Sequence, residues 1–213
     1  MASSRNSCSE NMSELEFNSP YELPSGLPIP VDDGACEHLP GVDVPSVVLP
    51  STGKRSVNVA EVSRGKVVFF FFPAAGRPGV PDPKGWNQIP GARGCTPQAC
   101  GYHDLYEEFR KLGFQVFGVS AQRREDLVEI TQRNRLSYEL LSDSELRLAK
   151  ALHLPTFQVE STIPLVPPLC IRRLSLVVTS GKVERVFYPV FPPDKNAGEV
   201  LRYLQSRQTR LAM

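Results

Sequence analysis

Two cysteines five residues apart, Cys95 and Cys100, are the side chains of this sequence best suited to chemistry. Cys95 stands at or just before the expected start of a helix, because Pro97 favours a first helical position and Thr96 suits an N-cap. Unpaired N–H groups and the positive end of the helix dipole gather at such a start. They stabilise a thiolate over a thiol, so the pattern indicates a nucleophilic sulfur at Cys95.

Cys100 lies inside the same expected helix, whose apolar residues recur at helical spacing as far as Leu112, before Gly113 ends it. In an intact helix, positions five residues apart are separated by roughly 8–9 Å. A disulfide needs Cα atoms within about 7 Å of each other. Cys95 and Cys100 can therefore bond only if the first turn unwinds. The alternative interpretation is that both are small buried residues without chemistry.

The elements around Cys95 predict an α/β sheet. The apolar run Val67–Phe72 shows no alternation, as expected for a central strand covered on both faces. A loop, the cysteine helix and a second strand over 114–119 follow, and this order predicts a unit of two parallel strands. Chemistry in such sheets concentrates at the junction between strand and helix. Further elements are expected at these positions: a helix over 120–134, a strand over 138–141, a capping box at 142–145 leading a helix to 152, an irregular stretch over 154–168, a hairpin of strands over 174–179 and 183–188, and a last helix from Asn196.

Three stretches, 71–73, 94–101 and 117–120, resemble those of the peroxiredoxins, and most closely the bacterioferritin-comigratory-protein or peroxiredoxin Q type. The similarity covers roughly residues 44 to 204. It implies an α/β thioredoxin-like fold with a central mixed sheet flanked by helices, and thiol-specific peroxidase activity. It also implies that Cys95 is the peroxidatic cysteine, Cys100 the resolving cysteine of the same subunit, and Arg173 the arginine beside Cys95. A guanidinium is permanently charged and suits that task.

The resemblance implies a cycle without a metal or an organic cofactor. Hydrogen peroxide or an alkyl hydroperoxide oxidises Cys95, Cys100 forms a disulfide with it, and a thioredoxin- or glutaredoxin-like reductant restores both thiols. Resolution within one helix needs no partner subunit, so a monomer is expected. Two alternatives on the same fold stay open: a thiol–disulfide oxidoreductase, whose usual spacer is two residues rather than four, and a redox sensor with slow turnover.

The loop over 74–94 departs from the peroxiredoxin pattern. Pro73 lies 22 positions before Cys95 instead of seven, so about 15 residues are inserted, a length typical of functional or disordered loops. Ala92 stands where the family usually has Thr or Ser, whose hydroxyl helps hold the thiolate and the peroxide. Trp86 could cover the site as a lid or simply anchor its loop. Arg93 could add positive charge near Cys95.

Composition sets the remaining expectations. The 213 residues carry a net charge of +1. A content of 41% hydrophobic and 22% charged residues is ordinary for a soluble protein, and the length fits one domain. The sequence has no basic stripe with interleaved aromatic residues, so nucleic-acid binding is not expected. No apolar run is long enough to span a membrane. The N-terminus fits neither a secretory signal nor a transit peptide, and five cysteines form no disulfide framework, so a reducing, cytoplasmic location is expected. Residues 1–43 are expected to form a partly disordered N-terminal extension, and residues 44–208 the peroxiredoxin domain.

The other cysteines offer weaker candidates. Cys36 and His38 lie near acidic residues, but an exposed loop is the favoured interpretation because too few metal ligands converge. Cys36 is kept as a second disulfide partner in the oxidised protein. Cys170 is expected to serve packing. A zinc site of Cys95, Cys100 and His103 lacks a fourth ligand, so no metal is expected.

Overall fold

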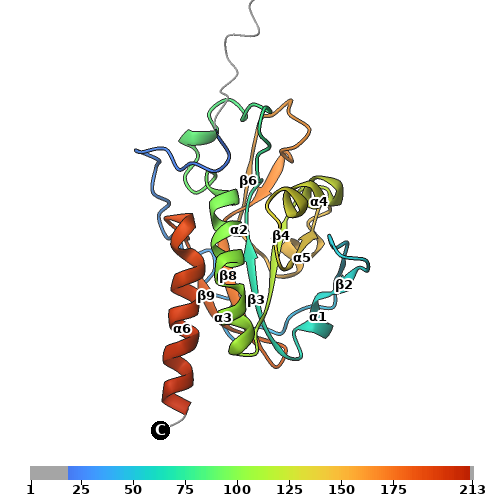
Figure 1. The fold of residues 1–213 in the computed structure, drawn as a ribbon, viewed down its shortest axis with the longest axis vertical. Coiled ribbons are helices and arrows are strands. Elements are labelled where there is room, and N and C mark those ends of the chain that lie inside the picture. The colour runs from blue at the N-terminus through green and yellow to red at the C-terminus, as the bar shows by residue number, and fades with distance from the viewer. Residues whose placement is uncertain (1–18, 212–213) are drawn as a thin grey trace, which may run out of the picture.

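The computed structural model describes residues 19–211, so the first 18 residues of the extension expected to be partly disordered lie outside the described residues. A five-stranded sheet forms its centre (Figure 1), in the order β5-β4-β3-β8-β9. β3 pairs in parallel with β4, and β4 with β5, whereas β8 runs antiparallel to both β3 and β9. The strands are β3 (Lys66–Phe71), β4 (Gln115–Ser120), β5 (Glu139–Ser142), β8 (Leu174–Thr179) and β9 (Lys182–Phe187). The expected α/β thioredoxin-like fold with a mixed sheet is confirmed.

The central strand β3 is buried on both faces, which explains its uninterrupted apolar sequence. Val68, Phe70 and Phe72 contribute to one apolar cluster, and Val67, Phe69 and Phe71 to the other. Because successive side chains of a strand point to opposite faces, one strand supplies both cores. Four helices pack into the first cluster: α2 (Cys95–Asp104), α3 (Tyr106–Lys111), α4 (Arg124–Arg133) and α6 (Asn196–Leu211). Two pack into the second: α1 (Val59–Val62) and α5 (Arg147–Ala151).

The helix expected to run without a break to Leu112 is two helices. Leu105, with φ −102° and ψ 8°, leaves the helical region between α2 and α3, although its N–H still bonds Gly101 O at 3.3 Å. Glu107 and Glu108 stand in the first turn of α3. Carboxylates favour a helix start, so this sequence supports a new helix beginning after Leu105.

The capping box expected at 142–145 is wrong. Ser142 belongs to β5, and its hydroxyl donates to Gln122 O at 2.6 Å. The start of α5 is capped instead by Asp143, whose carboxylate accepts the N–H groups of Leu148 at 3.2 Å and Ala149 at 2.9 Å. The stretch over 154–168, expected to be irregular, contains β6 (Thr156–Gln158), which pairs with β7 (Leu169–Ile171). The remaining short elements are β1 (Val48–Leu49), β2 (Val57–Asn58), η1 (Trp86–Gln88) and η2 (Pro193–Lys195).

The described part of the N-terminal extension, residues 19–43, packs on the domain without forming a helix. Cys36 and Leu39 are buried in the second apolar cluster. The N–H groups of Gly41 and Val44 bond the carbonyls of Val183 and Gly181, so this segment covers the outer edge of β9. The boundary between 43 and 44 stays a prediction. Within residues 19–211, no helix has both the length and the apolar character that crossing a bilayer requires.

Phe70 is the side chain whose loss should cost the sheet most. It is fully buried and stacks on Tyr102 of α2, with ring centroids 4.3 Å apart. We expect Phe70→Ala to lower the free energy of unfolding by about 3–5 kcal/mol, because a large cavity opens between β3 and α2. Urea denaturation measures this, with Val48→Ala as the control, since Val48 is 47% exposed. A loss for Phe70→Ala no larger than for the control would contradict this view of the core.

Candidate active site

Cys95 is the first residue of α2, as the sequence predicts, but the cap is not the expected one. The N-cap is Gly94, with φ 99°, a left-handed conformation that favours glycine. A methyl group there would collide with Pro193 and lie 2.7 Å from Leu23 Cδ2. Thr96 lies inside the first turn, where its buried hydroxyl has no hydrogen-bond partner among the described residues. Only a glycine at position 94 therefore allows the loop to place Cys95 at the start of α2.

Arg173 brings a buried positive charge to Cys95. Its Nη2 donates to Cys95 Sγ at 3.2 Å, and both residues are 3% exposed. The same guanidinium donates to the carbonyls of Gly91, Ala92 and Arg93 at 3.0–3.2 Å. A permanent cation in contact with sulfur favours a thiolate over a thiol. Of two adjacent arginines, Arg173 is thus the one at the sulfur, whereas Arg172 lies 5.8 Å from the centroid of the Phe157 ring.

Ala92 leaves the site without the hydroxyl that the family pattern would place three residues before the cysteine. Its carbonyl oxygen accepts from Cys95 Sγ at 3.5 Å, so the main chain supplies the contact at this position. Its methyl group belongs to a third apolar cluster, together with Trp86 and Cys170. The sulfur therefore has one charged donor, Arg173, and one carbonyl acceptor.

Cys100 lies five residues further along the same continuous helix and is half-buried. Both cysteines are free, and helix geometry holds their Cα atoms roughly 8–9 Å apart. Burial raises the pKa of Cys100, and the neighbouring Asp104 carboxylate adds to the rise, while Arg133 opposes it. The Tyr138 hydroxyl donates a hydrogen bond to Ala99 O at 2.6 Å and so holds this part of α2. A direct disulfide therefore needs α2 to open.

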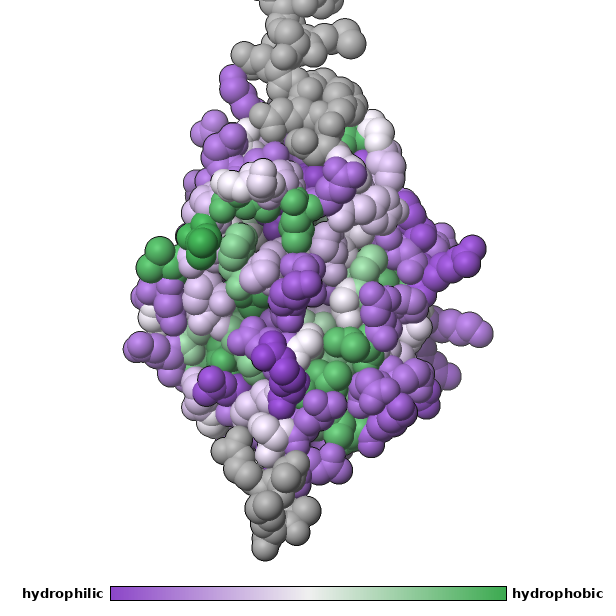
Figure 2. Space-filling view, turned by 60° about the vertical axis from the view of Figure 1, so that its left-hand side comes forward, coloured by the Kyte–Doolittle hydropathy of each residue, from purple (hydrophilic) through white to green (hydrophobic). Residues whose placement is uncertain are grey.

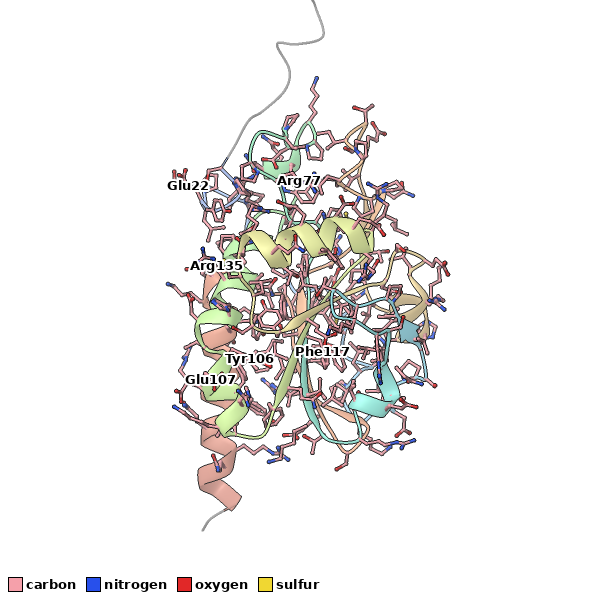
Figure 3. All side chains as sticks on the ribbon, turned by 45° about the vertical axis from the view of Figure 1, so that its right-hand side comes forward. Glu22, Arg77, Tyr106, Glu107, Phe117 and Arg135 are labelled. Carbon is pink, nitrogen blue, oxygen red and sulfur yellow. The ribbon has the colours of Figure 1, made fainter. Side chains whose placement is uncertain are left out.

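Three large side chains of the inserted loop make their contacts away from the sulfur. Trp86 is 3% exposed in the third cluster, with its ring 6.3 Å from that of Phe157, so the anchoring role is observed for Trp86. Arg93, expected as an extra charge near Cys95, is instead buried in an ion pair with Asp82. Arg77 pairs with Asp126 and Glu129 of α4, above which it is seen in Figure 3. Arg173 therefore provides the charge that contacts Cys95.

Residues 19–30, called the cover segment below, lie over the start of α2 (Figure 1). The carbonyl of Ser19 accepts from the Arg93 guanidinium, and Leu23 packs against Gly94. Tyr21 OH accepts from Arg133 at 2.8 Å, with the guanidinium 5.5 Å from the ring centroid. The surface of this side of the molecule mixes apolar with polar residues (Figure 2), and Ile29 is 68% exposed. Nothing in the helix and strand patterns of the sequence points to these contacts.

Of the remaining candidates, Cys36 and His103 stand apart from this site, whereas Cys170 packs in the cluster that contains Ala92. Cys36 was expected on an exposed loop but is 5% exposed, and burial, then Asp33 and Asp32, raises its pKa to about 12. Burial also raises the pKa of Cys170 to about 12, with a smaller contribution from Cys95. His103 Nδ1 accepts the N–H of Ser137 at 3.2 Å. Among residues 19–211, no three His, Cys, Asp or Glu side chains gather closely enough to hold a metal ion.

Comparison with known proteins agrees with this fold. The model of the family described as Redoxin matches residues 39–201, so the chain belongs to the redoxin family. It is 29% identical over 166 residues to the chloroplastic peroxiredoxin Q of Oryza sativa subsp. japonica, and the match covers 78% of this chain but 66% of that relative. The expected resemblance to peroxiredoxins of the Q type is therefore confirmed.

Solved structures show the same arrangement of elements. Peroxidoxin BcpB from Mycobacterium tuberculosis aligns with a TM-score of 0.61 and 26% identity, covering 79% of this chain and 98% of that one. Peroxiredoxin Q from Xanthomonas campestris aligns with a TM-score of 0.58 over 84% of this chain and 96% of that one. At 18% identity this second likeness shows the fold alone.

Reasoning from the sequence found Cys95, Cys100 and Arg173 but missed Gln98. Gln98 stands three residues after Cys95, is fully buried, and accepts a hydrogen bond from Arg173 Nη1 through its side-chain oxygen. The sequence contained a signal for Gln98, because a glutamine in the first turn of a buried helix needs a hydrogen-bond partner. Its partner, Arg173, comes from the segment that leads into β8, and spacing along the chain does not show this.

The raised pKa of Cys100 gives a test of the electrostatics around α2. A raised pKa means less thiolate at a given pH, so removing the Asp104 charge should lower the pKa and speed alkylation. In a Cys95→Ser background, we expect Asp104→Asn to increase iodoacetamide labelling of Cys100 at pH 8 by about twofold to fivefold. Peptide mass spectrometry follows the label, and Glu107→Gln on α3 is the control. Equal labelling rates in the two variants would rule out Asp104 as a cause.

The cover segment should limit access to Cys95. We expect Leu23→Ser to speed alkylation of Cys95 several-fold, because the side chain packed on Gly94 loses its apolar contact and the segment opens more often. Glu22→Ala is the matched control, since Glu22 is exposed on the neighbouring position (Figure 3). Labelling of Cys95 that is unchanged by Leu23→Ser would show that the cover does not control access.

Proposed function

We propose that this protein is a thiol peroxidase that reduces hydrogen peroxide and organic hydroperoxides through Cys95. The observation that carries the proposal is the contact of 3.2 Å between Arg173 Nη2 and Cys95 Sγ at the first residue of α2. A fixed cation there stabilises the thiolate that attacks and the negative charge that develops on the departing oxygen. Membership of the redoxin family supports the same reaction class.

In the first step, the Cys95 thiolate attacks one oxygen of the peroxide. A sulfur–oxygen bond forms, the oxygen–oxygen bond breaks, and the second oxygen leaves as an alcoholate or hydroxide that takes up a proton. Cys95 is oxidised by two electrons to a sulfenic acid, and the peroxide is reduced to an alcohol or water. Arg173 holds the sulfur while the charge moves from sulfur to oxygen.

In the second step, Cys100 attacks the sulfur of the Cys95 sulfenic acid. A disulfide forms and water leaves, taking the hydroxyl of the sulfenic acid and the proton of the Cys100 thiol. The step requires the first turn of α2 to unwind, because the intact helix keeps the two Cα atoms beyond disulfide range. The half-buried position of Cys100 on the same helix supports this route.

In the third step, a dithiol reductant of the thioredoxin or glutaredoxin type reduces the Cys95–Cys100 disulfide and is itself oxidised to a disulfide. The protein's own two cysteines complete the cycle, so we propose that a monomer is sufficient. We also propose a reducing, cytoplasmic location, because the cycle depends on a supply of reduced dithiol.

Stopped-flow mixing of the reduced protein with hydrogen peroxide tests the function directly. Trp86 and the other aromatic residues provide a fluorescence signal, and intact mass identifies the products. We expect oxidation at least about a hundredfold faster than that of an unperturbed thiol, lost in Cys95→Ser. Cys100→Ser should keep the fast first step but accumulate sulfenic acid instead of a disulfide.

Two results would contradict the peroxidase proposal. One is a Cys95→Ser protein that reacts as fast as the wild type, and the other is a wild type no faster than a free thiol. Cys170→Ser is the matched control, because Cys170 is a fully buried cysteine outside α2.

A redox sensor is the second candidate, favoured by the burial of Cys95, by the packing of the cover segment on the neighbouring Gly94, and by the absence of a hydroxyl at Ala92. A sensor would react slowly with peroxide and would bind a partner protein only after oxidation. Steady turnover of peroxide with a dithiol reductant favours the peroxidase, whereas one slow oxidation without turnover favours the sensor.

A further inference from the structure

A chain of buried polar side chains runs from Cys95 to the start of the C-terminal helix. Arg173 donates to Gln98 Oε1, and Gln98 Nε2 donates to Asn196 Oδ1 at 3.0 Å. Asn196 is the first residue of α6 and is 1% exposed. The sulfur, the guanidinium and two amides thus form one connected series that joins α2, the residue before β8, and α6.

The direction of every hydrogen bond in this series follows from Arg173. A guanidinium offers only donors, so Gln98 must turn its oxygen toward Arg173 and its NH2 group toward Asn196. Asn196 must then present its oxygen, since its NH2 group would meet the NH2 group of Gln98. An acceptor at Asn196 therefore fixes the orientation of Gln98, and Gln98 fixes the guanidinium.

The same Asn196 oxygen joins the elements around the site. It accepts from Tyr102 OH at 2.9 Å and from Ser175 Oγ at 2.7 Å. Burial raises the pKa of Tyr102, which keeps its phenol protonated and able to donate. Ser175 lies in β8, two residues after Arg173, which directly precedes the strand. One oxygen thus holds two side chains of α2 to side chains of β8 and α6.

We propose that Asn196 is a positioning residue: acting through Gln98, its oxygen holds the Arg173 guanidinium against Cys95 and keeps the first turns of α2 helical. This inference rests on the proposed function for its kinetic consequences. It predicts opposite effects on the two chemical steps. Without the acceptor, attack on peroxide slows because Arg173 loses its fixed position, and disulfide formation speeds up because α2 opens more readily.

The test compares Asn196→Leu, which removes the acceptor at similar volume, with Asn196→Asp, which keeps an acceptor oxygen. For Asn196→Leu, we expect oxidation of Cys95 by hydrogen peroxide to slow about tenfold and formation of the Cys95–Cys100 disulfide to speed up several-fold. Asn196→Asp should restore the first rate to within about threefold of the wild type. Slowing of both steps by the same factor, or of neither, overturns the proposal.

Val200→Ala is the matched control on the same helix, because Val200 is fully buried and its side chain makes apolar contacts only. It should destabilise the protein without changing the two rates in opposite directions. If Val200→Ala reproduces the pattern, Asn196 acts only through stability. If Asn196→Leu does not fold, Asn196→Ala removes the acceptor with a smaller side chain and is judged by the same outcomes.

A double-mutant cycle tests the route through Gln98. In a Gln98→Leu background, Asn196→Leu should have little further effect on the peroxide step, because the connection to Arg173 is already broken. Additive effects would overturn the proposed route.

A measurement without peroxide separates this inference from the proposed function. The rate of iodoacetamide labelling of Cys95 is compared at one fixed pH, and we expect Asn196→Leu to label several-fold more slowly than the wild type, because the sulfur has lost its fixed guanidinium. An unchanged labelling rate overturns the positioning role even if the protein is a fast peroxidase. A slower labelling rate supports the role even if the wild type fails to react with peroxide.

Discussion

The buried guanidinium of Arg173 is the constraint on which the site depends. A cation that is 3% exposed is costly unless its donors are satisfied. Three successive carbonyls of the loop before Cys95, together with Gln98, supply the acceptors, and the sulfur takes one of the remaining contacts. The loop and the first turn of α2 are therefore folded around one charge. The charge that contacts the Cys95 sulfur is the same one that orders the loop before it.

The two proposed chemical steps make opposite demands on α2. Attack on peroxide needs Cys95 held rigidly beside Arg173, whereas disulfide formation needs the same turn to open so that Cys100 can reach it. The contacts that hold α2 come from outside the helix: Tyr138 on Ala99, Asn196 on Gln98, and Leu23 on Gly94. Each is a hydrogen bond or an apolar contact of modest energy, of the order of 1 kcal/mol. Such a set can hold the helix in its ground state and still let it open.

The inserted loop and the cover segment meet beside the site. Both lie at the end of the sheet where α2 begins (Figure 1), and they contact each other where Arg93 bonds Ser19 O. Trp86 fixes the loop to the β6–β7 pair, and the ion pair of Arg93 with Asp82 links the end of the loop to its middle. The environment of Cys95 is thus assembled from segments widely separated in the chain.

The sequence by itself determined the two cysteines at a helix start, the central strand and the hairpin strand over 174–179, because these depend on residue types and periodicity within a few positions. It also identified Arg173, although through a resemblance rather than through physics. The tertiary structure decided what those local rules could not. Gly94 rather than Thr96 is the cap, since Pro193 and Leu23 leave no room for a side chain there. Asp143 rather than Ser142 caps α5, since Ser142 belongs to a strand. Gln98 and Asn196, 98 positions apart, meet only because α6 packs on α2, and a buried polar group takes its partner from whatever the fold brings within reach.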